Sequence, residues 1–329
     1  MTMRVFSGIR ASGDKTFGNY SGGFRQYAAT QEQGEAFFCI VDLHSITTAY
    51  EPQGLYEATL SLAAMLFATG LDPKRSTVFA QSHVPAHAEA AWLLSSVTAF
   101  GELRRMTQFK DKADEQDFVS AALFSYPVLM AGDILLYQTD IVPVGDDQRQ
   151  HVELARDVAD RFNQRYGKTF TVPRGVFPEE GARIRNLQEP ERLMSTSAGS
   201  PQGVVRLIDP PDVVRKKFKT AVTDSGRDVR HDPESKPGIS NLLEIMSVAT
   251  GEPIRELEAR YDGQGYGPFK EDVAESVVSL LGPIQARYEE LRSDERELRH
   301  LLAQGAEKAR EESAPTLAAM FERMGFVAP

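Results

Sequence analysis

The chain has 329 residues, of which 41% are hydrophobic and 26% are charged, and its formal net charge at pH 7 is −10. This length predicts two domains. The acidic net charge argues against broad electrostatic adhesion to nucleic acid. A local basic patch, such as VRKKFK at 214–219, is still compatible with RNA recognition. Cys39 is the only cysteine in the sequence, which excludes a disulfide framework and a cysteine zinc cluster within the chain. No apolar run approaches the roughly 20 residues of a membrane span. We therefore expect a cytoplasmic protein with no signal peptide and no membrane partner.

Four short apolar runs in the first half of the chain predict β-strands, at 4–9, 36–42, 77–81 and 140–144. They show little polar alternation, which is typical of strands covered on both faces. Amphipathic helical stretches lie between them, such as LYEATLSLAAMLFATG, which ends at Gly70. Strands that alternate with helices predict an α/β fold with a doubly wound parallel sheet, in which ligands bind beyond the carboxyl ends of the strands.

From Pro210 onward the pattern changes to helices. DPPDVVRKKFKTAV begins with prolines and an aspartate, which is good chemistry for a helix start, and the later stretches have helical periods. We therefore expect a C-terminal all-helical domain and place the change of domain within 185–210.

The loop after the first strand reads SGIRASGDKTFGNYSGGFRQY and is rich in glycine. Glycines let backbone N–H groups approach a phosphate or a nucleoside closely, next to the start of a helix. The spacing matches neither the GxGxxG fingerprint nor a P-loop. Nucleotide binding and an ordinary glycine-rich connection both remain open.

The loop after the fourth strand reads DIVPVGDDQRQHVELARDVADRF. Asp146 or Asp147 there has the position of a residue that caps the following helix. The functional alternative is that Gly145, Asp147 and Gln148 meet a ribose and an amine at the carboxyl edge of the sheet.

Asp133 stands among apolar residues in SYPVLMAGDILLYQ. A buried acid needs a partner, which is either a backbone or arginine group or the N–H of a ligand ring. Met130 beside it is either core or an adaptable apolar wall.

The histidines and the tryptophan carry weaker signals. His44 follows the second strand and is placed either for a ligand or for a backbone hydrogen bond. His83 and His87 are separated by Pro85, which argues against metal binding on one helix face. Trp92 lies in a helical AAWLL pattern that is typical of a core or an interface.

Residues 192–200, RLMSTSAGS, combine small residues, hydroxyls and glycine, as a loop that handles phosphate does. No lysine lies inside the stretch, where a polyphosphate would most need one. A phosphate loop and an ordinary surface connection both remain open.

Together these segments resemble the bacterial tryptophanyl-tRNA synthetases over nearly the whole chain. The resemblance is carried, in family order, by SGI, TFGNY, IVDLHSIT, PAHAEAAW, GELRRMTQFK, YPVLMAGDILLYQTDIVPVGDDQRQHVELARDVADRFN, GARI, AVTDS and KPGISNLLEI. TFGN corresponds to the HIGH-type motif of the family and LMSTS to its KMSKS loop.

The resemblance implies a class I catalytic domain at 1–190, with an inserted dimerisation segment near 85–130. It further implies that 191–329 holds the signature loop and a helical domain that binds the tRNA anticodon. The implied reaction is activation of L-tryptophan by ATP to tryptophanyl-adenylate, followed by transfer to tRNA(Trp), in a homodimer. Mg²⁺ is expected on the ATP phosphates, and no metal site on the protein is expected.

Site residues follow from the resemblance position by position, with Asp133 as the acceptor of the indole N–H. The other residues expected to bind the amino acid are Phe6, Gly8, His44, Tyr126, Met130, Val142, Val144 and Gln148. The residues expected to bind ATP are Arg10, Ala11, Ser12, Gly18, Asn19, Gly145, Asp146, Asp147, Ile184, Met194 and Ser195. Catalytic roles fall to Thr16, Asn19, Lys112, Gln148 and Ser195.

The chain departs from the family pattern at three positions. Leu193 and Thr196 replace both lysines of the KMSKS loop, and Arg10 replaces a glutamine. Loss of one preorganised donor costs on the order of 10²–10³ in rate, so we expect compensation from Arg192, Arg10 or Lys112. The alternatives are a synthetase-like paralogue that binds tryptophan or its adenylate without charging tRNA, an RNA-binding scaffold with a vestigial pocket, and tyrosine as the substrate.

Overall fold

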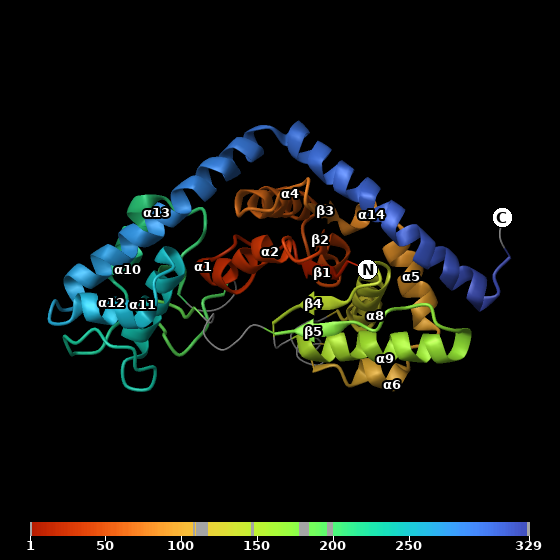
Figure 1. The fold of residues 1–329 in the computed structure, drawn as a ribbon, viewed down its shortest axis with the longest axis horizontal. Coiled ribbons are helices and arrows are strands. Elements are labelled where there is room, and N and C mark those ends of the chain that lie inside the picture. Colours follow the sequence, from red (N-terminus) through yellow and green to blue (C-terminus); the bar gives the residue numbers. More distant parts are fainter. Residues whose placement is uncertain are drawn as a thin grey trace.

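The fold is built on a five-stranded parallel sheet in the computed structural model, which describes residues 2–107, 109, 118–145, 148–177, 184–195 and 200–327. Its strand order is β3-β2-β1-β4-β5 (Figure 1). The strands are β1 (Arg4–Ile9), β2 (Glu35–Ile40), β3 (Ser76–Ala80), β4 (Ile141–Pro143) and β5 (Arg174–Val176). The predicted α/β fold class with its doubly wound sheet is confirmed.

Central β1 pairs with β2 on one side and with β4 on the other, where Val5 lies opposite Ile141. The chain therefore builds β2 and β3 outward in one direction and then β4 and β5 in the other. The strand order reverses between β1 and β4, and the carboxyl ends of these two strands form the switch point where such sheets bind ligands.

Helices flank the sheet and lie between successive strands. In the first 177 residues they are α1 (Phe17–Asn19), the π-helix η1 (Tyr20–Phe24), α2 (Arg25–Thr30), α3 (Asp42–Ser45), α4 (Pro52–Ala68), the 3-10 turn η2 (Gln81–His83), α5 (Ala86–Ser95), α6 (Phe100–Arg104), α8 (Ala121–Leu135) and α9 (Arg149–Tyr166). The second strand ends earlier than its apolar run predicts, because Asp42 begins α3 and its carboxylate accepts hydrogen bonds from the backbone and hydroxyl of Ser82.

The C-terminal part is helical, as predicted from the change of pattern after Pro210. It comprises the 3-10 turn η4 (Pro201–Gly203), α10 (Pro211–Lys219), α11 (Pro237–Thr250), α12 (Ile254–Tyr261), α13 (Tyr266–Ser293) and α14 (Glu295–Met324). Helices α10 to α12 cluster around the first half of α13, and the two long helices meet at an angle above the sheet (Figure 1).

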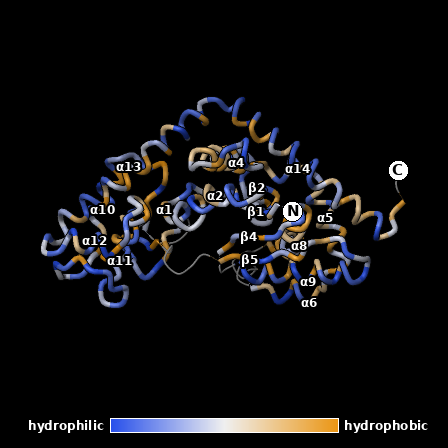
Figure 2. Tube along the Cα trace, viewed as in Figure 1, coloured by the Kyte–Doolittle hydropathy of each residue, from blue (hydrophilic) through white to orange (hydrophobic). Residues whose placement is uncertain are grey.

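Helix α14 returns to the sheet and packs on β3 and α5. A Cβ at Gly305 would collide with the backbone carbonyl of Val78, so only glycine allows the helix to lie this close to the strand. Arg310 secures the contact by donating to the carbonyl of His83 at 2.8 Å. Hydrophobic and hydrophilic residues alternate along both long helices (Figure 2), as expected for helices with one packed face.

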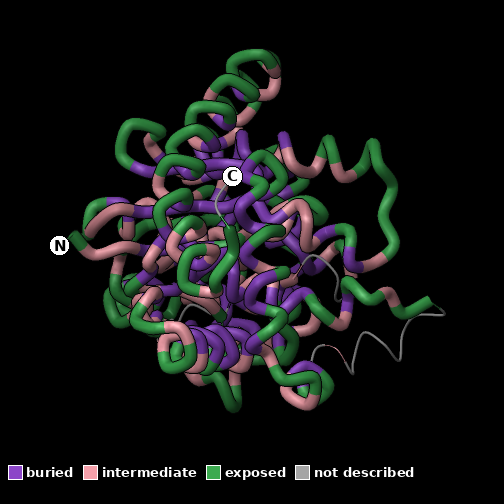
Figure 3. The backbone as a smooth tube through the Cα atoms, turned by 90° about the vertical axis from the view of Figure 1, so that its right-hand side faces the viewer, coloured by how far each residue is buried: buried purple, intermediate pink, exposed green. Residues whose placement is uncertain are grey.

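Buried segments run through the centre of the molecule, and exposed turns lie at its periphery (Figure 3). The strands are the most buried elements: every residue of β3 and five of the six in β2 are buried. Within the described ranges, no helix is long and apolar enough to cross a membrane.

Candidate functional site

A cavity of about 450 Å³ opens at the switch point between β1 and β4. Its walls come from the carboxyl ends of these strands, from the start of α3 and its following turn, and from one face of α8. The lining residues are Phe6, Gly8, Arg10, Val41, His44, Thr47, Tyr126, Met130, Asp133, Ile134, Val142, Val144 and Gln148. This volume is in the range of small-molecule sites.

All nine residues that the sequence places around the amino acid lie in this lining, together with Arg10. The walls are mainly apolar, and the polar groups are few, as in a site that positions one ligand by a small number of hydrogen bonds. The sequence did not single out Val41, Thr47 and Ile134. Val41 and Ile134 stand in apolar runs, and Thr47 lies in the segment HSITTAY, in which His44 was the stronger candidate.

Asp133 is the most constrained polar group of the cavity, with 1% of its surface exposed. Its Oδ1 accepts hydrogen bonds from Gln81 Nε2 at 2.7 Å and His87 Nδ1 at 2.6 Å, and its Oδ2 accepts one from His44 Nε2 at 2.9 Å. Burial alone would raise the pKa of this carboxyl, but the two histidines outweigh it and lower the pKa to about 2. The carboxylate is therefore ionised. Oδ1 accepts two hydrogen bonds and Oδ2 accepts one, so Oδ2 can accept one more, and Asp133 is among the residues that line the cavity.

His87 is the functional residue that the sequence analysis weighed only as a metal ligand. It is fully buried, donates from Nδ1 to Asp133 and accepts at Nε2 from the hydroxyl of Tyr137 at 2.9 Å. Pro85 is the N-cap of α5, so His83 lies in the preceding 3-10 turn and is exposed, whereas His87 lies in the first turn of α5 and is buried. The available signal was Asp133 itself, because a buried acid demands nearby donors.

The lining also carries the groups expected to meet the ammonium and carboxylate of an amino acid. Tyr126 shares a hydrogen bond with His151 Nε2 at 2.8 Å, and Gln148 stands at the N-cap of α9, where its backbone N–H donates to Gly145. Arg10 donates to Thr48 Oγ1 at 2.9 Å. Burial lowers the pKa of the Arg10 guanidinium.

The TFGN turn forms a second part of the site and begins α1 with a capping box. The hydroxyl of Thr16 accepts from the backbone N–H of Asn19, and the side chain of Asn19 accepts from the backbone N–H of Thr16. A Cβ on Gly18 would lie 2.5 Å from the carbonyl oxygen of Met194. The turn therefore touches the beginning of the 192–200 loop.

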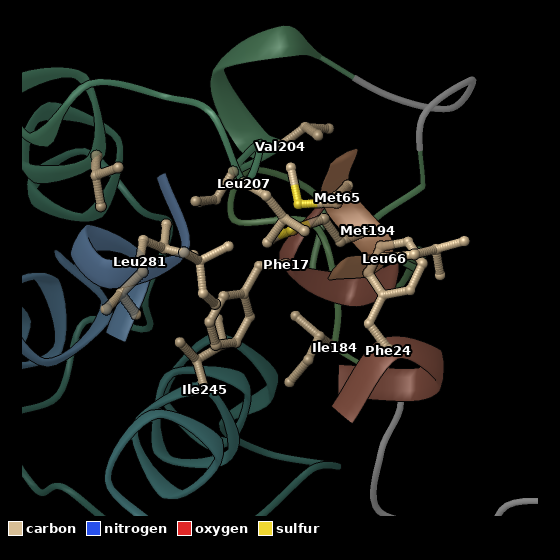
Figure 4. Packing of buried hydrophobic residues seen from close by; sticks show 14 of the residues in the cluster. Phe17, Phe24, Met65, Leu66, Ile184, Met194, Val204, Leu207, Ile245 and Leu281 are labelled. Carbon is tan, nitrogen blue, oxygen red and sulfur yellow. The ribbon is translucent and has the colours of Figure 1, made fainter. Parts of the chain in front are cut away.

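Met194 holds that loop by its side chain, which is buried beside Phe17 (Figure 4). Its backbone N–H donates to the carbonyl of Ile184, the residue expected near adenine. Leu193, in place of a lysine, is half exposed. Arg192, one expected substitute for that lysine, pairs with Glu189 at 3.1 Å.

The remaining predicted residues fall into two groups. Ala11 is buried in the core, Ser12 is exposed in the turn after β1, and Ser195 is partly buried after Met194. Lys112, Asp146, Asp147 and Thr196 lie outside the described residues.

The basic patch at 214–219 is smaller in the structure than in the sequence. Lys217 is buried and pairs with Asp209 at 2.6 Å, and Arg215 pairs with Glu275. Lys216 and Lys219 remain exposed on α10.

Comparison with known proteins places these features in one family. The family described as tRNA synthetases class I (W and Y) matches residues 1–282. A tryptophan–tRNA ligase of Leifsonia xyli is 51% identical over 329 residues, with 99% of this chain and 98% of that protein covered. One from Caldanaerobacter subterraneus is 50% identical over 324 residues and covers 98% of both.

Solved structures give the same relation. A tryptophanyl-tRNA synthetase from Mycoplasma pneumoniae superposes with a TM-score of 0.90 at 37% identity, and the match covers 99% of each chain. The enzyme from Campylobacter jejuni, complexed with ADP and tryptophan, superposes with a TM-score of 0.86 at 35% identity and covers 98% of this chain and all of that one.

Proposed function

The chain belongs to the class I tRNA synthetases for tryptophan and tyrosine, and we propose that it is an ATP-dependent tryptophan–tRNA ligase. It activates L-tryptophan with ATP to tryptophanyl-adenylate and pyrophosphate and then transfers the amino acid to tRNA(Trp). The observation that carries this proposal is the ionised, buried Asp133 in an apolar cavity at the switch point of the sheet.

Asp133 selects the substrate by accepting the indole N–H at the free lone pair of Oδ2. Phe6, Met130 and Val142 supply the apolar walls around the ring. A site built around such a hydrogen bond rejects amino acids that lack the donor, because the buried acceptor then loses its partner. Phenylalanine has no donor on its ring. The hydroxyl of tyrosine is a donor, but it stands at the far end of a single six-membered ring and not where the indole N–H stands, which makes tryptophan the better substrate.

The reacting end of the amino acid lies toward Arg10, Tyr126 and Gln148. One oxygen of the tryptophan carboxylate attacks the α-phosphorus of ATP, and the bond to the β-phosphate breaks as pyrophosphate leaves with the bonding electron pair. No covalent enzyme intermediate is needed, so catalysis consists of positioning and of stabilising negative charge on the phosphates.

The nucleotide occupies the neighbouring surface, where the turn 10–12, Gly18, Asn19 and Gly145 supply backbone groups and Ile184 lies near adenine. Thr16 and Ser195 add hydroxyls on the phosphate side. The described residues hold no group of three or more His, Cys, Asp or Glu side chains that fits a metal ion. Independently of that, we propose that Mg²⁺ arrives bound to the ATP phosphates, whose charge it neutralises.

Domain roles follow the same proposal. Residues 1–190 form the catalytic part, and 191–329 hold the signature loop and the helices that read the anticodon. Because α14 packs on the sheet, α10 to α13 are the helices available to tRNA, with Lys216 and Lys219 as exposed cations. An enzyme that charges tRNA works in the cytoplasm, where translation consumes its product.

Tryptophan-dependent exchange between ATP and pyrophosphate tests the activation step, and charging of tRNA(Trp) tests the transfer. We expect both, with kcat/KM for phenylalanine, whose ring has no donor, lower on the order of 10⁴-fold, and with tryptophan preferred over tyrosine in direct competition. Exchange without charging would instead support the synthetase-like paralogue, which the lysine-free 192–200 loop favours. Folded protein with neither activity would refute the proposal.

We further propose a homodimer that uses the segment 85–130. Aromatic side chains there are exposed to an unusual degree: Trp92 by 80%, Phe118 by 79% and Phe100 by 68%. Because Trp92 is exposed, it is not a core residue, and this exposure supports its assignment to an interface. Large exposed apolar side chains mark association surfaces.

Trp92→Glu is expected to weaken dimerisation about 30-fold, because an aromatic anchor contributes about 2 kcal/mol or more at an interface. Sedimentation velocity over a concentration series measures this. Val327→Glu, at another exposed position near the C-terminus, is the control and leaves the dimer intact. A wild-type chain that sediments as a monomer throughout would contradict the homodimer.

A further inference from the structure

Lys15 is a charged residue that the family motifs do not explain, and it lies in the turn between β1 and α1. Its backbone carbonyl accepts from Leu207 N–H at 2.8 Å, which fixes the main chain. The side chain folds back over the turn, and its ammonium donates to the carbonyls of Arg10 at 3.0 Å and Ser12 at 2.8 Å. The ammonium is thereby held at the carboxyl end of β1, beside the cavity that Arg10 lines.

The charges of Lys15 and Arg10 act on each other in this turn. Neither Lys15 nor Arg10 makes an ion pair within the part of the chain that the structure describes, and the adjacent Asp14 pairs with Arg206 at 3.6 Å. Burial, followed by the charge of Arg10, lowers the pKa of the Lys15 ammonium to about 8, against a smaller opposing effect of Asp14. The buried Nε of Arg10 has no hydrogen-bond partner among the described residues.

Two partly buried like charges repel each other and lose hydration, which costs free energy. An anion between the two cations removes the cost. Lysine has three N–H donors, of which carbonyls take two, so the third is left for that anion. The turn that holds Lys15 leads directly into Thr16 and Gly18, which contact the 192–200 loop.

We propose that Lys15 is a further catalytic residue, which contacts the triphosphate of ATP together with Arg10 and supplies positive charge that Leu193 and Thr196 do not. This inference rests on the proposed function, since it takes ATP as the ligand. The ammonium stabilises the charge that builds on pyrophosphate as the bond to the α-phosphorus breaks. Preorganised donors of this kind account for about 10²–10³ in rate.

Two substitutions separate charge from simple support of the turn. Lys15→Gln keeps an N–H donor for the carbonyls of Arg10 and Ser12 but removes the charge, whereas Lys15→Arg keeps the charge. We expect Lys15→Gln to lower kcat/KM for ATP in pyrophosphate exchange about 10²-fold or more and leave tryptophan affinity unchanged. Lys15→Arg recovers part of the loss, and Lys74→Met, at an exposed lysine, has no effect.

A purely structural lysine would give the reverse pattern. Lys15→Gln would then retain activity, or it would lose ATP and tryptophan affinity together with thermal stability. Either result overturns the proposal.

A second measurement needs neither a variant nor turnover. In the wild-type protein, ATP with Mg²⁺ is expected to protect Lys15 from an amine-acetylating reagent at least 10-fold, as followed by peptide mass spectrometry, while Lys74 reacts at the same rate. Equal labelling of Lys15 with saturating ATP overturns the proposal, even if the variants fail to fold. Protection without tryptophan-dependent exchange supports the phosphate site and counts against the proposed function alone.

Discussion

Asp133→Asn is expected to lower kcat/KM for tryptophan about 10²-fold, mainly through KM, while KM for ATP stays near its wild-type value. Hydrogen bonds to a charged group contribute about 1.5–3 kcal/mol, which corresponds to roughly 10- to 150-fold. In the proposed binding mode, the hydrogen bond from the indole N–H is made in the ground state and the transition state alike, so its loss appears in KM. Steady-state pyrophosphate exchange with varied tryptophan measures the effect.

The geometry around Asp133 explains why asparagine does not substitute for it. If the amide oxygen takes the place of Oδ1, the NH₂ group faces His44 and the indole N–H, so that donors meet. If the amide is flipped, the NH₂ group faces Gln81 and His87, which must then both change their hydrogen bonding. Either orientation also removes the charge that strengthens each bond.

Asp160→Asn is the matched control, because Asp160 is exposed on α9 and the substitution removes the same charge. Its tryptophan KM should equal that of the wild type. An unchanged KM in Asp133→Asn would mean that the indole ring binds elsewhere.

The pH dependence of tryptophan binding tests whether the Asp133 carboxyl stays ionised over the working pH range. The pKa of Asp133 is about 2 in the folded protein and about 3.9 in an unfolded chain. Because the folded value is the lower one, its contribution to stability is complete above about pH 4 and is lost as pH falls toward 2. Asp133 therefore adds no inflection to the pH profile of KM for tryptophan above about pH 4.

The sheet was predictable from sequence because its four main strands are continuous apolar runs, and burial on both faces leaves that signature in the residues themselves. β5 was not predictable, since Arg174–Val176 is mostly exposed and, unlike β4, holds a charged residue and a glycine instead of an apolar run. Helix α14 was predictable as a helix but not as a cover of β3. The spacing of its apolar residues predicts that one face is packed, but the sequence does not show that this face packs against β3. The close approach of Gly305 to β3 shows it in the structure.

The cavity was predictable to a large extent because its residues stand at strand ends and on one face of α8. The partners of Asp133 were not, since Gln81, His87 and His44 lie 52, 46 and 89 residues away in sequence. A buried acid in the sequence implies that hydrogen-bond donors lie around it, but it does not identify the residues that supply them. Lys15 escaped notice for a related reason: its uncompensated charge appears only when the surrounding ion pairs are known.

Gly18→Ala is expected to reduce kcat for pyrophosphate exchange by at least 10-fold and to loosen the start of the 192–200 loop. The added Cβ would lie 2.5 Å from the carbonyl oxygen of Met194 and 3.4 Å from its Cβ. Met194 has little freedom to retreat, because its side chain is buried beside Phe17 and its N–H is bonded to Ile184. The loop start must therefore move, at a cost of about 1–3 kcal/mol.

In Gly18→Ala, helix propensity and the clash with Met194 act in opposite directions on stability. Gly18 lies in α1, and alanine is a better helix former than glycine by about 1 kcal/mol. Propensity alone would make the variant more stable. Gly267→Ala tests that part separately: Gly267 lies in α13 with open space around its Cβ position, so the control should be neutral or slightly stabilised with full activity.

Limited trypsin digestion distinguishes a displaced loop from a Cβ that merely obstructs ATP. Arg192 is exposed at the start of the loop, and cleavage after it should be faster in Gly18→Ala than in the wild type or Gly267→Ala. Full activity with unchanged cleavage would show that the close approach of the TFGN turn to Met194 is not needed. Faster cleavage with reduced kcat would show that the contact between the TFGN turn and Met194 positions the lysine-free loop against the phosphates. Hydroxyl and backbone groups have short reach, so they depend on close positioning more than a long cationic side chain does.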